Sequence, residues 1–246
     1  MRKIQQFAFL GAFLALAAVP RAWAQPWVSF DDNTRYLALG DSLSAGYAAH
    51  PATQGFAYQV YQSGTIDSIN NLLFCDAAVP NAQSSDVLHY QVPQAHLFFA
   101  ATGKDYRKVL TLTVGGNDAF TVVGPNGQIT GDVNAMLLAF GANLGAILTS
   151  LVTQFPDAKI FVGNLYDPEL PIPGEPLLVN AMNGVIAQVS GGFAGHVVLV
   201  DIHTAFEGRH GLLLSERHGS APDQVHPTNA GYQVMAKAFE DAIRQN

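Results

Sequence analysis

The chain has 246 residues, of which 49% are hydrophobic and 13% are charged, a composition typical of a globular protein and not of a disordered one. Its 12 Lys and Arg residues stand against 19 Asp and Glu residues, and this acidic balance excludes the basic surface that nucleic-acid binding requires. The only cysteine, Cys75, rules out an intramolecular disulfide, and its place after an apolar run indicates a buried thiol at the end of a strand.

The first 24 residues have the features of a cleavable signal peptide. Arg2 and Lys3 precede an apolar run at 7–19, and Ala22-Trp23-Ala24 fits the small-x-small pattern before a cleavage site. The run is shorter than the roughly 20 residues that a spanning helix needs, so an uncleaved membrane anchor is the weaker alternative. We therefore expect a mature protein that starts at Gln25, is secreted or periplasmic, and has no stable membrane insertion after cleavage.

The remainder, 25–246, has a length suited to a single domain. Short aliphatic runs alternate with longer segments that have apolar residues three and four positions apart. Strands are expected at 36–39, 69–74, 109–114, 159–164 and 196–202, with 69–74 the weakest, and helices at 56–67, 84–100, 132–154, 176–189 and 228–244. Runs that are apolar on successive residues are typical of strands covered on both faces. The alternation predicts an α/β fold with a doubly wound parallel sheet of about five strands, which binds ligands beyond the carboxyl ends of its strands.

Turn-forming residues mark two loops in this pattern. Residues 124–128 are predicted to form a protruding hairpin or a lid segment, and the proline-rich segment 167–176 is predicted to form a stiff loop.

A polar cluster follows the first predicted strand. Ser42 comes directly after Gly40-Asp41, where glycine permits a sharp turn, and we expect it at the start of a helix with its hydroxyl in the crevice. This position suits a nucleophile, with helix N–H groups beside a developing oxyanion. Gly-Asp-Ser also occurs in purely structural turns and caps, so the cluster alone is weak evidence.

Two further clusters follow later strands or precede the last helix. In Gly115-Gly116-Asn117-Asp118, Asn117 can direct an amide N–H toward negative charge, although an Asn-Asp turn is the structural alternative. In the segment 223–228, Asp223 stands three residues before His226 and can bond its Nδ1–H, which leaves Nε2 free as a base. Pro227 favours an extended His226 and Thr228 can cap the helix that follows.

Together, Gly40-Asp41-Ser42-Leu43, Gly115-Gly116-Asn117-Asp118 and Asp223-x-x-His226 resemble, in order, three diagnostic blocks of the SGNH/GDSL hydrolase family. The resemblance implies a flavodoxin-like three-layer α/β/α sandwich and an esterase or lipase-like acyl hydrolase. It also implies a Ser42 nucleophile, a His226 base, an Asp223 orienting group, and no metal or organic cofactor.

The same resemblance implies an oxyanion hole made by the N–H of Ser42, the side chain of Asn117 and a backbone N–H from the segment 77–84. Asn81 aligns where the family usually has glycine, and asparagine is the other residue that best tolerates a positive φ. The expected substrate is a small-molecule, lipid or glycan ester, and Phe120, Val122, Val123, Leu170, Ile172, Leu177 and Leu178 are candidates for an apolar acyl groove.

Three alternatives remain open from the sequence. A carbohydrate O-deacetylase would use the same catalytic residues on an acetylated sugar polymer. A non-catalytic exported carbohydrate-binding or adhesive module would keep the fold without the activity. A zinc site among Asp201, His203, Glu207, His210 and His218 is disfavoured, because their spacing matches no compact ligand motif.

Overall fold

The structure is a computed structural model, which describes residues 33–100, 106–209, 211–213, 217–218 and 221–246. The expected signal peptide at 1–24 lies outside the described residues.

Five parallel strands form the central sheet, and this confirms the predicted fold class. They are β1 (Thr34–Gly40), β2 (Leu72–Asp76), β3 (Lys108–Thr113), β4 (Lys159–Gly163) and β5 (Val197–Val200), in the order β2-β1-β3-β4-β5. Leu37 of β1 lies beside Cys75 of β2 and Leu110 of β3. The strand order changes direction between β1 and β3, and in such sheets ligands bind at the carboxyl ends on either side of this point.

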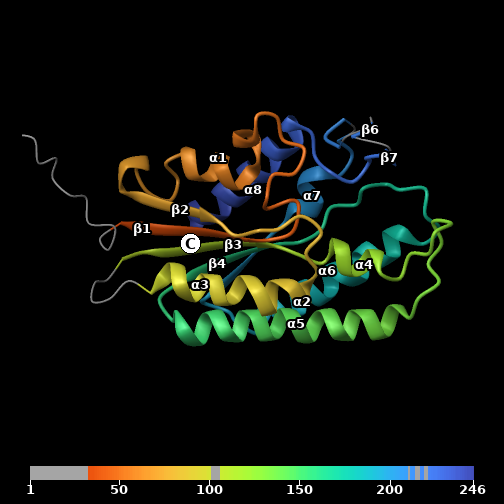
Figure 1. Cartoon of the computed structure of the whole chain (residues 1–246), viewed down its shortest axis with the longest axis horizontal. Coiled ribbons are helices and arrows are strands. Elements are labelled where there is room, and N and C mark those ends of the chain that lie inside the picture. The colour runs from red at the N-terminus through yellow and green to blue at the C-terminus, as the bar shows by residue number, and fades with distance from the viewer. Residues whose placement is uncertain (1–32, 101–105, 210, 214–216, 219–220) are drawn as a thin grey trace, which may run out of the picture.

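Helices cover both faces of the sheet in three layers (Figure 1). One face carries α1 (Phe56–Gln62), α7 (Ile202–Phe206) and α8 (Asn229–Gln245), and the other carries α2 (Ser84–Asp86), α3 (Val92–Phe99), α5 (Val133–Gln154) and α6 (Glu175–Gly191). The short helix α4 (Gly116–Phe120) follows β3.

Shorter elements complete the chain. Two 3₁₀ helices are η3 (Ala52–Gln54) and η4 (Ile69–Asn71), and the π-helical segment η5 (Val87–Gln91) joins α2 to α3. The strands β6 (Arg217–His218) and β7 (Ala221–Pro222) pair in antiparallel fashion.

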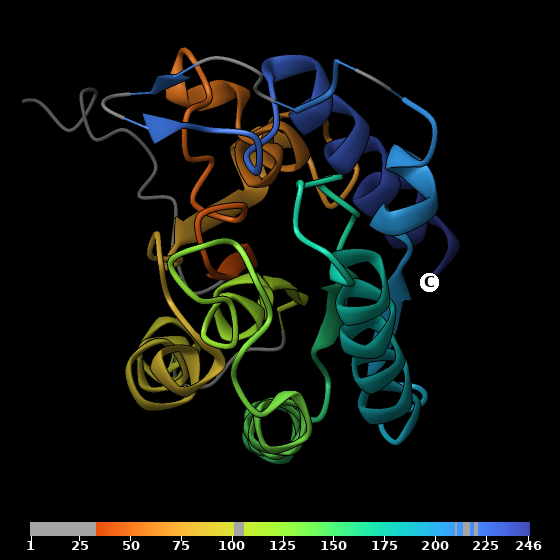
Figure 2. The same cartoon turned by 90° about the vertical axis from the view of Figure 1, so that its right-hand side faces the viewer.

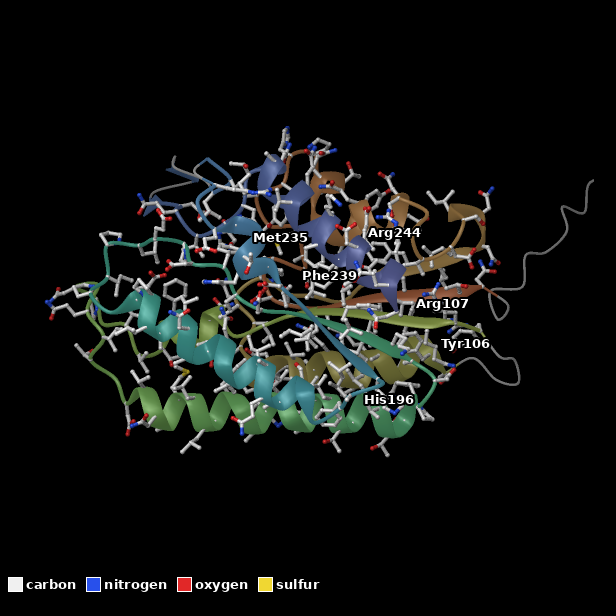
Figure 3. All side chains as sticks on the ribbon, turned by 180° about the vertical axis from the view of Figure 1, so that it is seen from behind. Tyr106, Arg107, His196, Met235, Phe239 and Arg244 are labelled. Atoms are coloured by element: carbon white, nitrogen blue, oxygen red, sulfur yellow. The ribbon has the colours of Figure 1, made fainter. Side chains whose placement is uncertain are left out.

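The sheet divides the hydrophobic core into two parts. Along β1, Leu37 and Leu39 pack on the side of α3, α5 and α6, whereas Tyr36 and Ala38 pack on the side of α1 and α8. Figure 3 shows Met235 and Phe239 on α8, and both are fully buried in the second part. All seven residues of β1 are buried, as expected for a strand covered on both faces.

Helix α5 has no charged residue over 22 positions. Among the described residues it is the one helix that is long and apolar enough to span a membrane by length and composition. Its buried residues include Met136, Phe140, Leu144, Ile147 and Leu151, which are the helical stripe that the sequence predicts. They belong to the hydrophobic core on that face of the sheet, so α5 is packed along one side.

Several boundaries differ from the predictions. The last strand ends at Val200 and not at Ile202, because the Asp201 side chain caps α7 by accepting from the Thr204 N–H at 3.0 Å. The helix expected at 56–67 ends at Gln62. The hairpin at 124–128 is confirmed by the bond from the Gly124 N–H to the Gln128 carbonyl, and the loop before α6 ends at Gly174.

Candidate active site

Ser42 follows the carboxyl end of β1, two residues after Gly40. Figure 2 views the molecule from the side of these carboxyl ends. The turn begins at Gly40, whose φ is 130° and where a Cβ atom would lie 1.9 Å from the Thr113 carbonyl oxygen. Only glycine fits this close approach of β1 to β3. The Asp41 N–H then donates to the same carbonyl at 3.1 Å, which directs the chain away from the sheet.

The expectation of a helix beginning at Ser42 is wrong. Residues 42–48 form consecutive turns, because Gly46 and Ala48 both have a φ of 64°, which interrupts helical geometry. Regular α-helix begins only at Phe56. The positive end of a helix dipole therefore does not act at Ser42, and its turn is stabilised in another way.

The carboxylate of Asp41 stabilises this turn. It is 2% exposed, and its Oδ1 accepts from the Leu43 N–H at 3.0 Å and from the Thr113 hydroxyl at 3.1 Å. The Ser44 hydroxyl extends the network to Thr113 at 2.8 Å. Complete burial raises the pKa of Asp41 to about 7, against the opposing effect of these hydrogen bonds.

His226 connects the end of the chain to Ser42. Its Nε2 lies 2.8 Å from the Ser42 Oγ, and its Nδ1 lies 2.8 Å from the Asp223 Oδ2. The Asp223 Oδ1 also accepts from the N–H groups of His226 and Val225, at 3.0 and 3.1 Å. One carboxylate thus fixes both the ring and the backbone of the histidine. Thr228 caps α8 as predicted, since its hydroxyl accepts from the Gly231 N–H.

The electrostatics of this pair favour an ionised Asp223. Burial alone would raise the pKa of its carboxyl, but the hydrogen bonds from the His226 N–H and ring, together with the Val225 N–H, outweigh burial and hold the pKa below its usual value. The Tyr47 ring packs on the His226 ring with centroids 4.5 Å apart, and the Tyr47 carbonyl accepts from the Tyr232 hydroxyl. These contacts hold the imidazole in place from a second side.

The three residues predicted to supply oxyanion donors, Ser42, Asn81 and Asn117, line one cavity. Asn81 has a φ of 68°, the positive value expected at this position. The Asn117 side chain donates one amide hydrogen to the Ala82 carbonyl at 3.0 Å, which leaves the second hydrogen for another acceptor. Within the described part of the chain, the N–H groups of Ser42 and Asn81 have no protein acceptor.

Asp118 joins the segment of Asn81 to the end of β3, a role that the sequence analysis missed. Its two oxygens accept from the Ser84 N–H at 2.9 Å and from the Ser84 hydroxyl at 2.5 Å. Gln91 acts similarly on β1, since its side-chain amide bonds both the N–H and the carbonyl of Gly40. These partners lie 34 and 51 residues apart, so no local pattern could have indicated them.

A cavity of about 410 Å³ opens in front of Ser42 and His226. Five of the seven apolar residues predicted for a groove line it: Phe120, Val123, Leu170, Ile172 and Leu178. Of the other two, Val122 is buried beneath the surface and the side chain of Leu177 is 75% exposed. The loop before α6 therefore supplies much of the apolar wall.

Two of the residues considered for zinc have other partners. Asp201 caps α7, and the His203 Nδ1 lies 3.1 Å from the Leu165 carbonyl oxygen. Among the residues that the structure describes, no group of three His, Cys, Asp or Glu residues is placed to hold a metal ion. The side chains of His210 and His218 lie outside that part.

Comparisons with known proteins agree with this architecture. Residues 38–234 match the model of the GDSL-like Lipase/Acylhydrolase family. No curated protein matches the sequence.

Similar solved structures include an extracellular lipase from Streptomyces rimosus, with 19% identity over 85% of this chain and 99% of that chain and a TM-score of 0.61. A phospholipase A1 from Streptomyces albidoflavus NA297 has 21% identity over 85% and 99%, with a TM-score of 0.62. An acetylxylan esterase from Geobacillus stearothermophilus has 17% identity over 87% and 96%, with a TM-score of 0.58. At these identities the likeness concerns the fold, whereas the family match covers most of the chain and all three sequence blocks. The chain therefore belongs to the GDSL-like lipase/acylhydrolase family and is a carboxylic ester hydrolase.

Proposed function

We propose that Ser42, His226 and Asp223 form a catalytic triad that hydrolyses esters through an acyl-Ser42 intermediate. The observation that carries this proposal is the continuous chain of contacts from the Ser42 Oγ to the His226 Nε2 and from the His226 Nδ1 to the Asp223 Oδ2, each 2.8 Å long. This is the arrangement that a serine nucleophile, its base and an orienting acid require.

The reaction has two acyl-transfer steps. The Ser42 Oγ attacks the ester carbonyl carbon while His226 Nε2 takes its proton, and the same proton then passes to the leaving alcohol as the ester C–O bond breaks. A water molecule next attacks the acyl carbon with His226 as base, and the carboxylic acid leaves as Ser42 recovers its proton. Asp223 stabilises the imidazolium that forms in each step.

The oxyanion of each tetrahedral intermediate is proposed to bind the N–H groups of Ser42 and Asn81 and the side-chain amide of Asn117. All three residues line the cavity, and neither backbone N–H has a protein acceptor in the described ranges. Removing one such donor typically lowers kcat by about 10²- to 10³-fold.

The cavity wall favours an acyl chain over an acetylated sugar polymer. The segment between β4 and the first turns of α6 contributes Leu170, Ile172 and Leu178 to the lining, and the segment after β3 contributes Phe120 and Val123. The site thus offers apolar surface to a hydrocarbon chain. We therefore propose an esterase or lipase activity, with the carbohydrate O-deacetylase as the competing outcome of the test.

The test is hydrolysis of p-nitrophenyl esters from acetate to palmitate by the purified protein and its Ser42→Ala variant. We expect the best kcat/KM on an acyl chain longer than acetate, and loss of activity in the variant. A preference for acetate together with turnover of acetylated xylan would favour the deacetylase. Undiminished activity in Ser42→Ala would refute the proposed nucleophile.

We also propose that the protein is exported and that cleavage removes residues 1–24. The basis is the sequence pattern alone: Arg2 and Lys3, the apolar run at 7–19, and small residues at 22 and 24. Mass spectrometry of the protein recovered from the periplasm and medium of a bacterial host should find an N-terminus at Gln25. An intact Met1 on protein retained in the membrane fraction would contradict cleavage.

A further inference from the structure

A buried carboxyl group in the cavity wall has no role in the proposed mechanism. Glu175 is the first residue of α6 and follows Gly174, whose positive φ of 85° turns the loop into the helix. The residue is 5% exposed and lines the cavity. In the described part of the protein, neither of its carboxyl oxygens accepts a hydrogen bond from an N–H or O–H donor. A buried polar group without a donor is costly to a folded protein, so it calls for a functional explanation.

The charged neighbours of Glu175 are acidic. Asp167 and Glu169 lie in the loop before α6, and Asp41, Asp223 and His226 line other parts of the cavity. Among the described residues, no Lys or Arg lines this cavity. Burial raises the pKa of Glu175 to about 8, and the hydrogen bond and charge of the Asp167 carboxyl, followed by the charge of Glu169, act in the same direction. Glu175 therefore keeps its proton at neutral pH.

We infer that Glu175 is a substrate-binding residue that accepts a hydrogen bond from a hydroxyl group in the alcohol part of the ester. This inference rests on the proposed function, because it assigns a substrate class to the same cavity. The enzyme should then prefer uncharged polyol esters, such as partial esters of glycerol, to esters of equal size without hydroxyl groups.

The composition of the wall supports a hydroxyl over other groups. A carboxylate or phosphate would meet acidic residues, and the described part of the lining holds no Lys or Arg to balance its charge, so anionic esters are disfavoured. When protonated Glu175 donates its proton to the Asp167 carboxyl, its carbonyl oxygen still lacks a donor, and a substrate hydroxyl can fill that role without bringing charge into a buried site. Ile172 lies beside Glu175, since its carbonyl accepts from the Glu175 N–H at 3.0 Å, and both residues line the cavity.

The test compares two esters that differ only in hydroxyl groups, glycerol monobutyrate and propyl butyrate. We expect the wild-type enzyme to favour the glycerol ester in kcat/KM. Replacing Glu175 with leucine should lower the ratio of kcat/KM for glycerol monobutyrate to kcat/KM for propyl butyrate about tenfold, through a higher KM for the glycerol ester. Glu175→Gln keeps a carbonyl acceptor and should retain most of the preference. The control is Glu207→Gln, a carboxyl-to-amide change at an exposed position outside the cavity lining.

Each outcome bears on one proposal. Loss of all ester hydrolysis in Ser42→Ala tests the nucleophile, whereas the ratio between the two butyrates tests Glu175 independently. A Glu175→Leu variant with the wild-type ratio of kcat/KM for the two butyrates would overturn the inference. A wild-type enzyme that favours propyl butyrate would also overturn it, and that measurement does not depend on whether any variant folds. A Glu175-dependent preference for butyrylcholine over glycerol monobutyrate would also overturn it, because the site would then select a cation.

Discussion

Replacing Asp118 with alanine tests whether a residue outside the triad positions the oxyanion donors. The change removes two buried hydrogen bonds that fix Ser84, three residues after Asn81. Ser84 would keep its bond from the Asn143 amide, so we expect the fold to survive with a loss of about 2 to 3 kcal/mol in the free energy of unfolding. If the Asn81 N–H then leaves the oxyanion position, kcat should fall by about 10²-fold while KM changes little.

The assay is steady-state hydrolysis of p-nitrophenyl butyrate together with urea unfolding of the same samples. The matched control is Asp132→Ala, which removes the N-cap of α5, where the carboxylate accepts from the Ala135 N–H at 3.0 Å. This control should lose about 1 kcal/mol of stability and keep its kcat. A wild-type kcat in Asp118→Ala, despite the lower stability, would refute the argument that this contact positions the donor.

Three other perturbations give distinct results. Asp223→Asn should lower kcat by about 10³-fold or more, because the amide can no longer fix the imidazole tautomer, and near-normal kinetics would exclude the orienting role. Asn81→Gly should keep nearly the wild-type kcat and stability, whereas Asn81→Val should lose about 1 to 2 kcal/mol in the free energy of unfolding, because a β-branched residue is strained at a φ of 68°. Equal losses of stability in the two variants, measured by urea unfolding, would contradict the backbone argument. The folded pKa of Glu175, about 8, exceeds the ordinary value of 4.5, so the native state loses stability as pH rises through this interval. Glu175→Gln should therefore gain in Tm relative to wild type between pH 6 and pH 9, and a constant difference in Tm would show that Glu175 does not titrate there.

The strands and the long helices could be predicted because their signals are local. β1 and β3 are runs of apolar residues, and α5 carries a stripe with helical period that the structure buries. The motif blocks also predicted which residues meet, since parallel strands bring the segments after β1 and β3 to one edge of the sheet. Sequence reasoning thus identified residues from three distant segments, and the fold brings them to one cavity.

The remaining features depend on contacts between distant residues. Ser42 was expected to begin a helix, but the positive φ values at Gly46 and Ala48 and the long-range bonds to Thr113 produce a series of turns instead. The Asp118–Ser84 and Gln91–Gly40 contacts join residues that lie 34 and 51 positions apart, and Glu175 is exceptional only because tertiary packing buries it. No spacing pattern in the chain encodes these relations.

The turn at Gly40 has a consequence for how this enzyme can diverge. A side chain there would collide with the β3 backbone, so the residues that place Ser42 have almost no room for substitution. The wall that holds Leu170, Ile172 and Glu175 belongs to a different part of the chain, the β4–α6 connection and the start of its helix. Mutations can therefore accumulate in that wall and alter substrate preference while the geometry around Ser42 stays unchanged. Variation among related enzymes should concentrate in the β4–α6 connection, and directed evolution toward a new ester should begin there.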